Sequence, residues 1–128
     1  LSTLDAPSLC LLLGEGNGGG ALALLPADTI LAAQHAWLSP LPPEGASAIV
    51  HRDTAHADEM ARSQHVRSSD LHAIGLVDQI IPELPDAADE PEAFCQRVGQ
   101  VVAHELAVLA TTPLETLRQR RSLRINNL

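Results

Sequence analysis

Residues 9–25 read LCLLLGEGNGGGALALL, and this segment decides the fold. Its first five residues, 9–13, are an apolar run that ends at a glycine, which predicts a short strand buried on both faces. Glycine fills five of the seven positions 14–20, a density that indicates unusual backbone dihedral angles or the close approach of another group. Residues 21–25 predict a short helix that the following proline ends. The segment therefore predicts a strand, a glycine loop and a short helix in direct succession.

Strands and helices continue to alternate beyond this segment. Further strands are predicted at 28–33, 36–38 and 76–81, and further helices at 46–50, 56–66 and 71–74. Ser68 or Ser69 is expected to cap the third of these helices, and Gly75 to end it. This alternation is typical of an α/β domain.

Two longer helices are predicted after a connector at 84–91 that is rich in acids and contains two prolines. Apolar residues recur at helical spacing along the first of these helices: Phe94, Val98, Val101, Val102, Leu106 and Leu109. The second is expected to open with Thr112 as its cap, followed by Pro113, and Glu115 would complete a capping box. The chain therefore ends in helices.

The composition indicates a folded, acidic protein. Its 128 residues are 45% hydrophobic and 19% charged, with a formal net charge of -8. This charge argues against a nucleic-acid surface, which needs clustered cations. The length fits one domain over 1–128, with a core at 1–83 and C-terminal helices at 91–128.

The cysteines and the apolar runs bear on the compartment. Cys10 and Cys95 make neither a disulfide framework nor a metal cluster, which favours a reducing cytoplasm. The apolar run at 9–13 is too short to span a bilayer, and no signal peptide is visible. Because the sequence starts with Leu1 and not with Met, we expect a piece of a longer protein.

The glycine loop satisfies the pattern Gly-x-Gly-x-x-Gly at Gly14, Gly16 and Gly19, which is found in dinucleotide-binding loops. In those proteins the loop opens a full crossover helix, and an acid about 20 residues further on binds the ribose. Here Pro26 ends the helix early, and Gln34 stands where the acid is required. A dinucleotide site is therefore not expected.

Two interpretations of the loop remain. In the first, successive backbone N–H groups at the helix entrance converge on one developing negative oxygen, and glycine leaves that oxygen room to approach. In the second, the glycines only allow a tight turn that packs the helix on the strand. Glu15, inside the loop, is either a general base or a carboxylate that meets backbone N–H groups or an arginine of a partner.

Three blocks of sequence occur together: GEGNGGGALAL at 14–24, PEGASAIV at 43–50 and GLVDQIIPE at 75–83. In this order and at this spacing they resemble the carboxyltransferase alpha subunit of bacterial acetyl-CoA carboxylase, and the arginine-rich tail is similar to the C-terminus of that family. The sequence departs from the family's pattern at Gly18, where serine is usual, and at Ala46, where cysteine is common. The resemblance covers most of the chain.

The resemblance implies a crotonase-like α/β fold, a superhelix of β-β-α units of which this chain would be the C-terminal half with trailing helices. It also implies transfer of a carboxyl group from carboxybiotin to an acyl-CoA, such as acetyl-CoA, to give malonyl-CoA for fatty acid biosynthesis. The oxyanion-binding glycine pair of the family corresponds to Gly19 and Gly20, which are the catalytic candidates. The substrate-binding candidates lie at helix entrances and in a pocket wall: Gly18, Ala21, Pro43, Glu44 and Gly45.

The resemblance further implies partners. Biotin would be attached to a biotin carboxyl carrier protein and loaded by a biotin carboxylase, while a beta-type carboxyltransferase subunit or domain would stabilise the thioester enolate, all in a cytoplasmic oligomer. No nucleic acid and no membrane is expected as a partner. Two alternatives stay open: a non-catalytic scaffold half of a carboxyltransferase, and another crotonase-fold acyl-CoA enzyme such as a hydratase or decarboxylase subunit.

No metal is expected in this chain. Of its six histidines, His51 and His56 are five residues apart and do not share a helical face, and no Cys/His ligand spacing appears. Because the chain corresponds to only part of a crotonase unit, we expect it to be inactive by itself.

Overall fold

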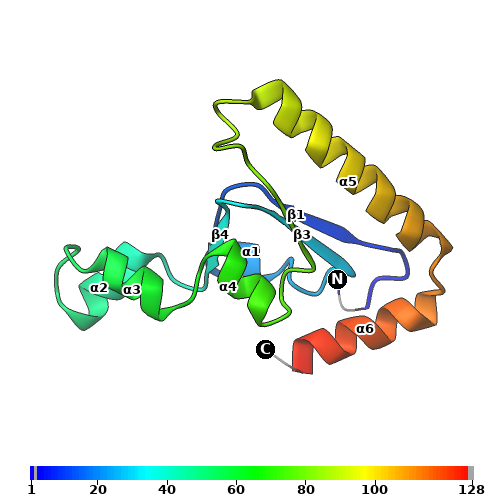
Figure 1. Ribbon diagram of the computed structural model, residues 1–128. Helices are drawn as coiled ribbons and strands as arrows, with labels where there is room; N and C mark the ends of the chain where they lie inside the picture. The colour runs from blue at the N-terminus through cyan, green and yellow to red at the C-terminus, as the bar shows by residue number, and fades with distance from the viewer. Residues whose placement is uncertain (2, 127–128) are drawn as a thin grey trace.

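The chain folds around a small parallel sheet (Figure 1). The computed structural model describes residue 1 and residues 3–126. Strands β1 (Leu9–Leu12), β3 (Thr29–Ala33) and β5 (Gln79–Ile81) form the main sheet in the order β1-β3-β5, and β2 (Glu15–Asn17) pairs in parallel with β4 (Trp37–Ser39). The helices are α1 (Gly18–Leu22), α2 (Pro43–Val50), α3 (Ala57–Ser63), α4 (Ser68–Ala73), α5 (Pro91–Thr111) and α6 (Leu114–Asn126). The predicted α/β class is confirmed.

Strand β3 is the centre of both the main sheet and the core. All five of its residues are buried, as expected for a parallel strand with a neighbour on each side. The register pairs Leu9 with Thr29 and Ala33 with Ile81. Strand β1 lies at the edge and is half-buried at all four positions. The prediction that β1 is buried on both faces is therefore wrong, because the residues that cover it leave part of each side chain exposed.

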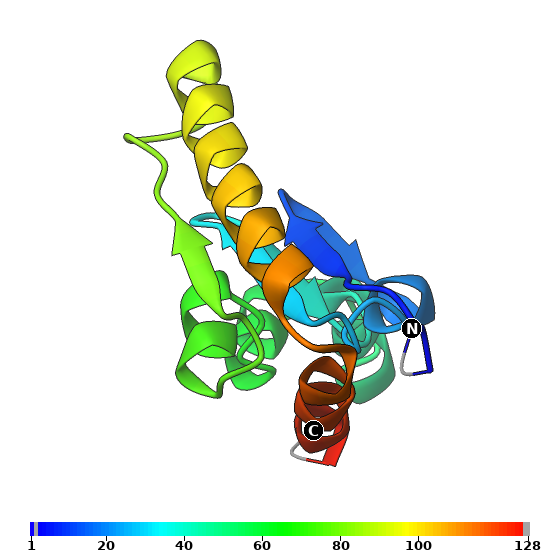
Figure 2. The same ribbon diagram turned by 90° about the vertical axis from the view of Figure 1, so that its right-hand side faces the viewer.

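Helix α5 covers one face of the main sheet. Phe94, Val98, Val101 and Val102 pack against the core, and Figure 2 shows the helix running between the two edge strands. The first part of the predicted apolar stripe is thus covered by the chain's own sheet, whereas Leu106 is 50% exposed. Among the described residues, no helix combines the length and the apolarity that crossing a bilayer requires.

The glycine-rich segment folds differently from the predicted loop. Glu15–Asn17 form strand β2, and α1 begins at Gly18, three residues before the predicted start at Ala21. Gly18 has a φ of +66°, a left-handed conformation that glycine adopts at little cost, and it turns the chain from strand into helix. Strand β2 forms because Trp37–Ser39 offers a parallel partner. This partner is distant in the sequence, so the local pattern around the glycines could not predict the strand.

Two predicted helix caps are wrong. The hydroxyl of Ser68 donates to the carbonyl of Gln34 instead of capping α4, whose N-cap residue is Arg67. The hydroxyl of Thr112 donates to the carbonyl of Val108, in the last turn of α5, at 2.8 Å. In both cases the hydroxyl donates a hydrogen bond to a carbonyl that lies outside the helix it was expected to cap.

Helix α4 ends as predicted, but the strand after it is shorter. Gly75 has a φ of +77°, the left-handed conformation that commonly ends a helix. The amides of Leu76 and Val77 then donate back to the carbonyl of Leu71. Because these amides are used in the turn, β5 begins at Gln79 and not at residue 76.

A buried ion pair ties α6 to the start of β3. Arg121 is 1% exposed, and its guanidinium donates to both carboxylate oxygens of Asp28, at 2.6 and 2.5 Å. The carbonyls of Leu1, Leu4 and Ala6 accept from its remaining donors. Arg121 therefore joins the last helix, the central strand and the N-terminal segment at one point.

We expect Gly16→Ala to lower the free energy of unfolding by about 1 kcal/mol, the low end of the overpacking range, because the atoms that a Cβ meets are the ends of leucine side chains. A Cβ at this position would lie 2.7 Å from Leu38 Cδ1 and 3.1 Å from Leu12 Cδ1, so both side chains would have to move. Gly14→Ala is the matched control, because a Cβ there meets nothing within 4 Å. Urea denaturation measures both variants, and equal stability of the two would contradict the packing argument.

Candidate functional site

Two helices begin at the same edge of the small sheet. Asn17 and Ser39 are the last register pair of β2 and β4. Helix α1 starts at Gly18, directly after β2, and α2 starts at Pro43, shortly after β4. The carboxyl ends of parallel strands are where α/β proteins usually bind ligands. The tertiary structure therefore brings the sequence blocks 14–24 and 43–50 together at the carboxyl ends of β2 and β4.

The backbone amides at the start of α1 are open. The first amides of a helix have no acceptor within the helix, and Gly19 and Gly20 are the second and third residues of α1. A Cβ built on Gly18, Gly19 or Gly20 would meet nothing within 4 Å. An anionic oxygen can therefore approach these donors closely, and Gly19 and Gly20 are exposed.

A cavity of about 400 Å³ lies beside the start of α2. Its apolar wall includes Trp37, Pro43 and Val66, and Glu44 stands at its lining in the first turn of α2. Polar side chains from three further segments complete the lining: Gln34, His35, Asp58, Arg67 and Ser69. The cavity can take an apolar group of modest size that carries a polar end.

The structure does not gather all the predicted site residues in this cavity. Pro43 and Glu44 line it, while the three glycines of α1 do not. Gly45 instead faces the side chain of Leu41, with 3.6 Å from a built Cβ to Leu41 Cδ1. Ala21 borders a small apolar hollow of about 60 Å³ within the core. The seven predicted residues thus share an edge of the sheet but not one chamber.

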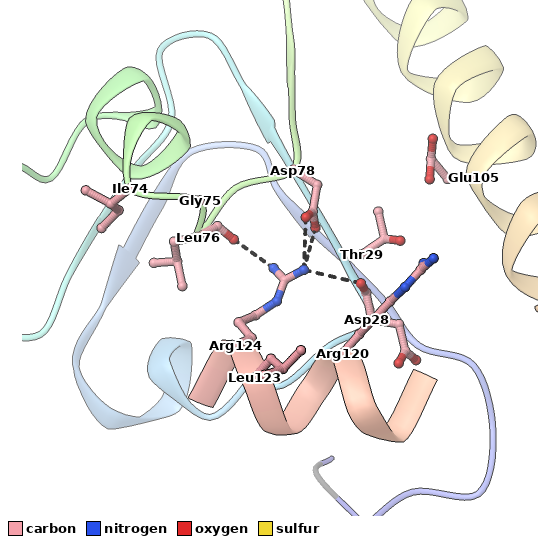
Figure 3. A pocket seen from close by; sticks show the side chains of 10 residues that line it. All are labelled: Asp28, Thr29, Ile74, Gly75, Leu76, Asp78, Glu105, Arg120, Leu123 and Arg124. Atoms are coloured by element: carbon pink, nitrogen blue, oxygen red, sulfur yellow. Dashed lines mark hydrogen bonds and ion pairs between the residues drawn. The ribbon is translucent and has the colours of Figure 1, made fainter. Parts of the chain in front are cut away.

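A second cavity, of about 520 Å³, lies at the opposite, amino end of the main sheet (Figure 3). Arg124 crosses it and donates to the carboxylate of Asp78 at 2.8 and 2.9 Å and to the carbonyl of Leu76 at 2.8 Å. Arg120 extends toward the side of α5, where Glu105 lies. No local sequence pattern indicates this cavity, because its lining comes from four separate segments.

Away from α1, titratable side chains form two clusters, each of which contains histidine and acidic residues. The rings of His51 and His56 stack with centroids 4.2 Å apart, and a hydrogen bond from His56 lowers the pKa of Asp53. His35 meets Glu83 and Asp86, a contact across 48 residues of sequence that no local spacing could reveal.

Cys10 is a half-buried packing residue of strand β1. It is half-buried in β1, and burial raises its pKa, an effect that Arg124 only partly opposes. A raised pKa keeps the thiol protonated and unreactive.

Comparison with known proteins shows which sequences this chain is similar to. Residues 1–128 match the model of the family described as acetyl co-enzyme A carboxylase carboxyltransferase-like. Over 113 residues the chain is 59% identical to a protein of Mycobacterium bovis described as a probable biotin-dependent acyl-coenzyme A carboxylase beta3 subunit, covering 88% of this chain and 23% of that protein. It is 38% identical over 120 residues to the acetyl-coenzyme A carboxylase carboxyl transferase subunit alpha of Methylobacterium nodulans, covering 93% of this chain and 38% of that subunit.

A solved structure supports the fold. The crystal structure of transcarboxylase 12S superposes with a TM-score of 0.65 at 25% identity, covering 88% of this chain and 21% of that one. The predicted crotonase-like fold and the predicted resemblance to the alpha subunit are thus confirmed. The chain spans well under half the length of each relative, 23% of the first and 38% of the second.

Proposed function

Because this chain belongs to the acetyl-CoA carboxylase carboxyltransferase family, we propose that it acts within a biotin-dependent acyl-CoA carboxylase and takes part in carboxyl transfer to an acyl-CoA. The single observation that carries this proposal is the pair of amides at Gly19 and Gly20, in the first turn of α1 where strand β2 passes into the helix. The first amides of a helix have no acceptor within the helix itself. Anionic oxygens are the ligands that such donors bind.

The proposed reaction depends on hydrogen-bond donors and does not require a titratable side chain from this part of the chain. Carboxybiotin, carried by a partner protein, would supply the carboxyl group, and negative charge would develop on its ureido oxygen as the N–C bond to that group breaks. The N–H groups of Gly19 and Gly20 donate to this oxygen and so stabilise the charge in the transition state. Since main-chain amides do this work, the absence of a nucleophile and base pair at this edge among the described residues is consistent with the reaction.

The remaining predicted residues shape the surroundings. Gly18 provides the left-handed turn that directs the next two amides outward, and Ala21 packs the helix on the core. Pro43 and Glu44 form part of the wall of the cavity beside the site, and Gly45 lies against the side chain of Leu41. We propose that this cavity accepts part of the acyl-CoA or of the biotin arm.

The proposed assembly follows from the same family membership. A beta-type carboxyltransferase part would stabilise the thioester enolate, and a biotin carboxyl carrier protein and a biotin carboxylase would deliver the carboxyl group. With acetyl-CoA as the acceptor the product is malonyl-CoA, the substrate of fatty acid synthesis. The proposed site of action is the cytoplasm.

A non-catalytic scaffold remains the second candidate, and one observation favours it. The open amides of α1 do not line the cavity at α2, so this chain could hold the assembly together while other residues perform the reaction. The two candidates differ in what substitution of Gly19 does to the complete enzyme, which separates them experimentally.

We expect residues 1–128 alone to form no malonyl-CoA from carboxybiotin and acetyl-CoA. The chain spans 23% and 38% of the two relatives and offers donors for one of the two developing oxyanions. The complete carboxylase that contains this chain should form malonyl-CoA, and avidin should abolish that activity by sequestering biotin. Radiolabelled bicarbonate incorporation measures both. Product formation by the chain alone, or avidin-resistant activity of the complete enzyme, would count against the proposal.

A further inference from the structure

We propose that His35, Glu83 and Asp86 bind one divalent metal ion of the Zn²⁺ type. Each side chain offers one ligand atom, and the three atoms lie within 4.8 Å of one another. His35 follows the end of β3, and the two acids follow the end of β5. Because β3 and β5 are parallel neighbours, their carboxyl ends meet, and this brings together residues that are 48 positions apart.

The distances between the ligand atoms fit a shared ion. His35 Nδ1 lies 3.2 Å from Glu83 Oε2 and 3.7 Å from Asp86 Oδ2. Two ligands held at about 2.1 Å from a tetrahedral ion are about 3.4 Å apart, between these two values. The contact with Asp86 is longer than a hydrogen bond.

The ligands are held in place by a set of backbone contacts. The Glu83 side chain is 5% exposed, and its two oxygens accept from the amides of His35 at 3.0 Å and Ala87 at 2.9 Å. Asp86 Oδ1 accepts from the amide of Ala88 at 2.8 Å, which leaves Oδ2 for the ion. Outer contacts of this kind orient metal ligands and strengthen binding. A cation between the two carboxylates would also remove their mutual repulsion.

The donor set selects the class of ion. One imidazole nitrogen with two carboxylate oxygens suits Zn²⁺ and similar divalent transition ions. Ca²⁺ needs six to eight oxygen ligands and Mg²⁺ prefers oxygen in octahedral geometry, so both fit poorly. His35 and Asp86 are each about half exposed. Solvent therefore reaches the site, and water can supply the fourth ligand.

The ion would link two segments beside the cavity at α2. His35 lines that cavity together with Trp37, the only tryptophan of the chain. Metal binding would join the β3–β4 connection to the segment after β5 and fix this part of the wall. The inference does not depend on the proposed carboxyl transfer, and it differs from the sequence-based expectation that the chain holds no metal.

Titration of the full chain with ZnCl₂ tests the proposal, with isothermal calorimetry and Trp37 fluorescence as readouts. We expect saturable binding of one ion per chain and a change in fluorescence, with no saturation by CaCl₂ or MgCl₂. His35→Ala and Asp86→Asn should each weaken binding by at least about 10-fold, the loss that even outer-contact changes cause. Asn at position 86 keeps an oxygen for the Ala88 amide.

Two matched variants control for other ligands. His104→Ala removes an exposed histidine of α5, and Cys95→Ser removes the exposed thiol, and neither should change the affinity. The substitutions at positions 35 and 86 are used because Glu83 is buried and its replacement could prevent folding. Failure of the wild-type chain to bind Zn²⁺, or unchanged affinity in either test variant, would overturn the proposal.

Discussion

Asp28→Asn should lower the free energy of unfolding by about 3–5 kcal/mol, the usual result of breaking a buried ion pair from one side. The guanidinium of Arg121 is 1% exposed and loses its only counter-charge among the described residues when the carboxylate becomes an amide. The amide also presents N–H donors toward a group that can only donate. The expected loss is large because the stranded guanidinium is 1% exposed and forms no other ion pair among the described residues.

Urea denaturation measures this loss, and an exposed pair provides the control. Asp5→Asn breaks the contact between Asp5 and Arg118, whose side chains are 70% and 49% exposed, and should leave stability nearly unchanged. The double variant Asp28→Leu with Arg121→Met removes both charges and should be more stable than Asp28→Asn alone. Equal effects of Asp28→Asn and Asp5→Asn would contradict the assigned role of the buried pair.

The same pair should make stability depend on acidity. Burial raises the pKa of Asp28, but the hydrogen bonds from Arg121 and Ser8 outweigh it, so the pKa lies below its ordinary value. A carboxyl whose pKa is lower in the folded state stabilises the fold above its unfolded pKa, about 3.9. This contribution falls as the pH drops from about 4 through the folded pKa. Asp28→Asn should remove that part of the acid dependence.

Gly19→Pro should reduce carboxyl transfer by the complete enzyme about 10²–10³-fold, the loss that follows removal of one oxyanion donor. Proline has no N–H group, so it deletes the proposed donor without adding a competing side-chain charge. Gly19 is the second residue of α1, and the first turn of a helix tolerates proline. A Cβ built at this position meets nothing within 4 Å, so we expect the fold to be kept.

Steady-state kinetics distinguish this loss from a structural one. The values of kcat and kcat/KM should fall together, as expected for an interaction made only in the transition state. Gly19→Ala keeps the N–H group and adds one methyl group, so its loss should be smaller than that of Gly19→Pro. Full activity in Gly19→Pro would support the scaffold alternative, provided that circular dichroism shows an unchanged fold.

Local patterns in the sequence determined the α/β class and most of the strands and helices, and the resemblance to the carboxyltransferase family indicated the candidate glycines. The apolar run at β1, the alternation through Gly75 and the spacing of residues along α5 depend on contacts between near neighbours, which a short stretch of sequence encodes. Gly19 and Gly20 are candidates because they correspond to the family's glycine pair, and their roles stay a prediction.

The tertiary structure alone decided which distant groups meet. Strand β2 formed within the glycine segment because Trp37–Ser39 lies beside it, and Ser68 bonds Gln34 instead of its own helix. The Asp28–Arg121 pair and the His35–Glu83 contact join residues 93 and 48 positions apart. Such contacts depend on strand order and on how whole elements pack. The pattern of neighbouring residues does not reveal the strand order or the packing of the elements, because both are fixed only when the complete core forms.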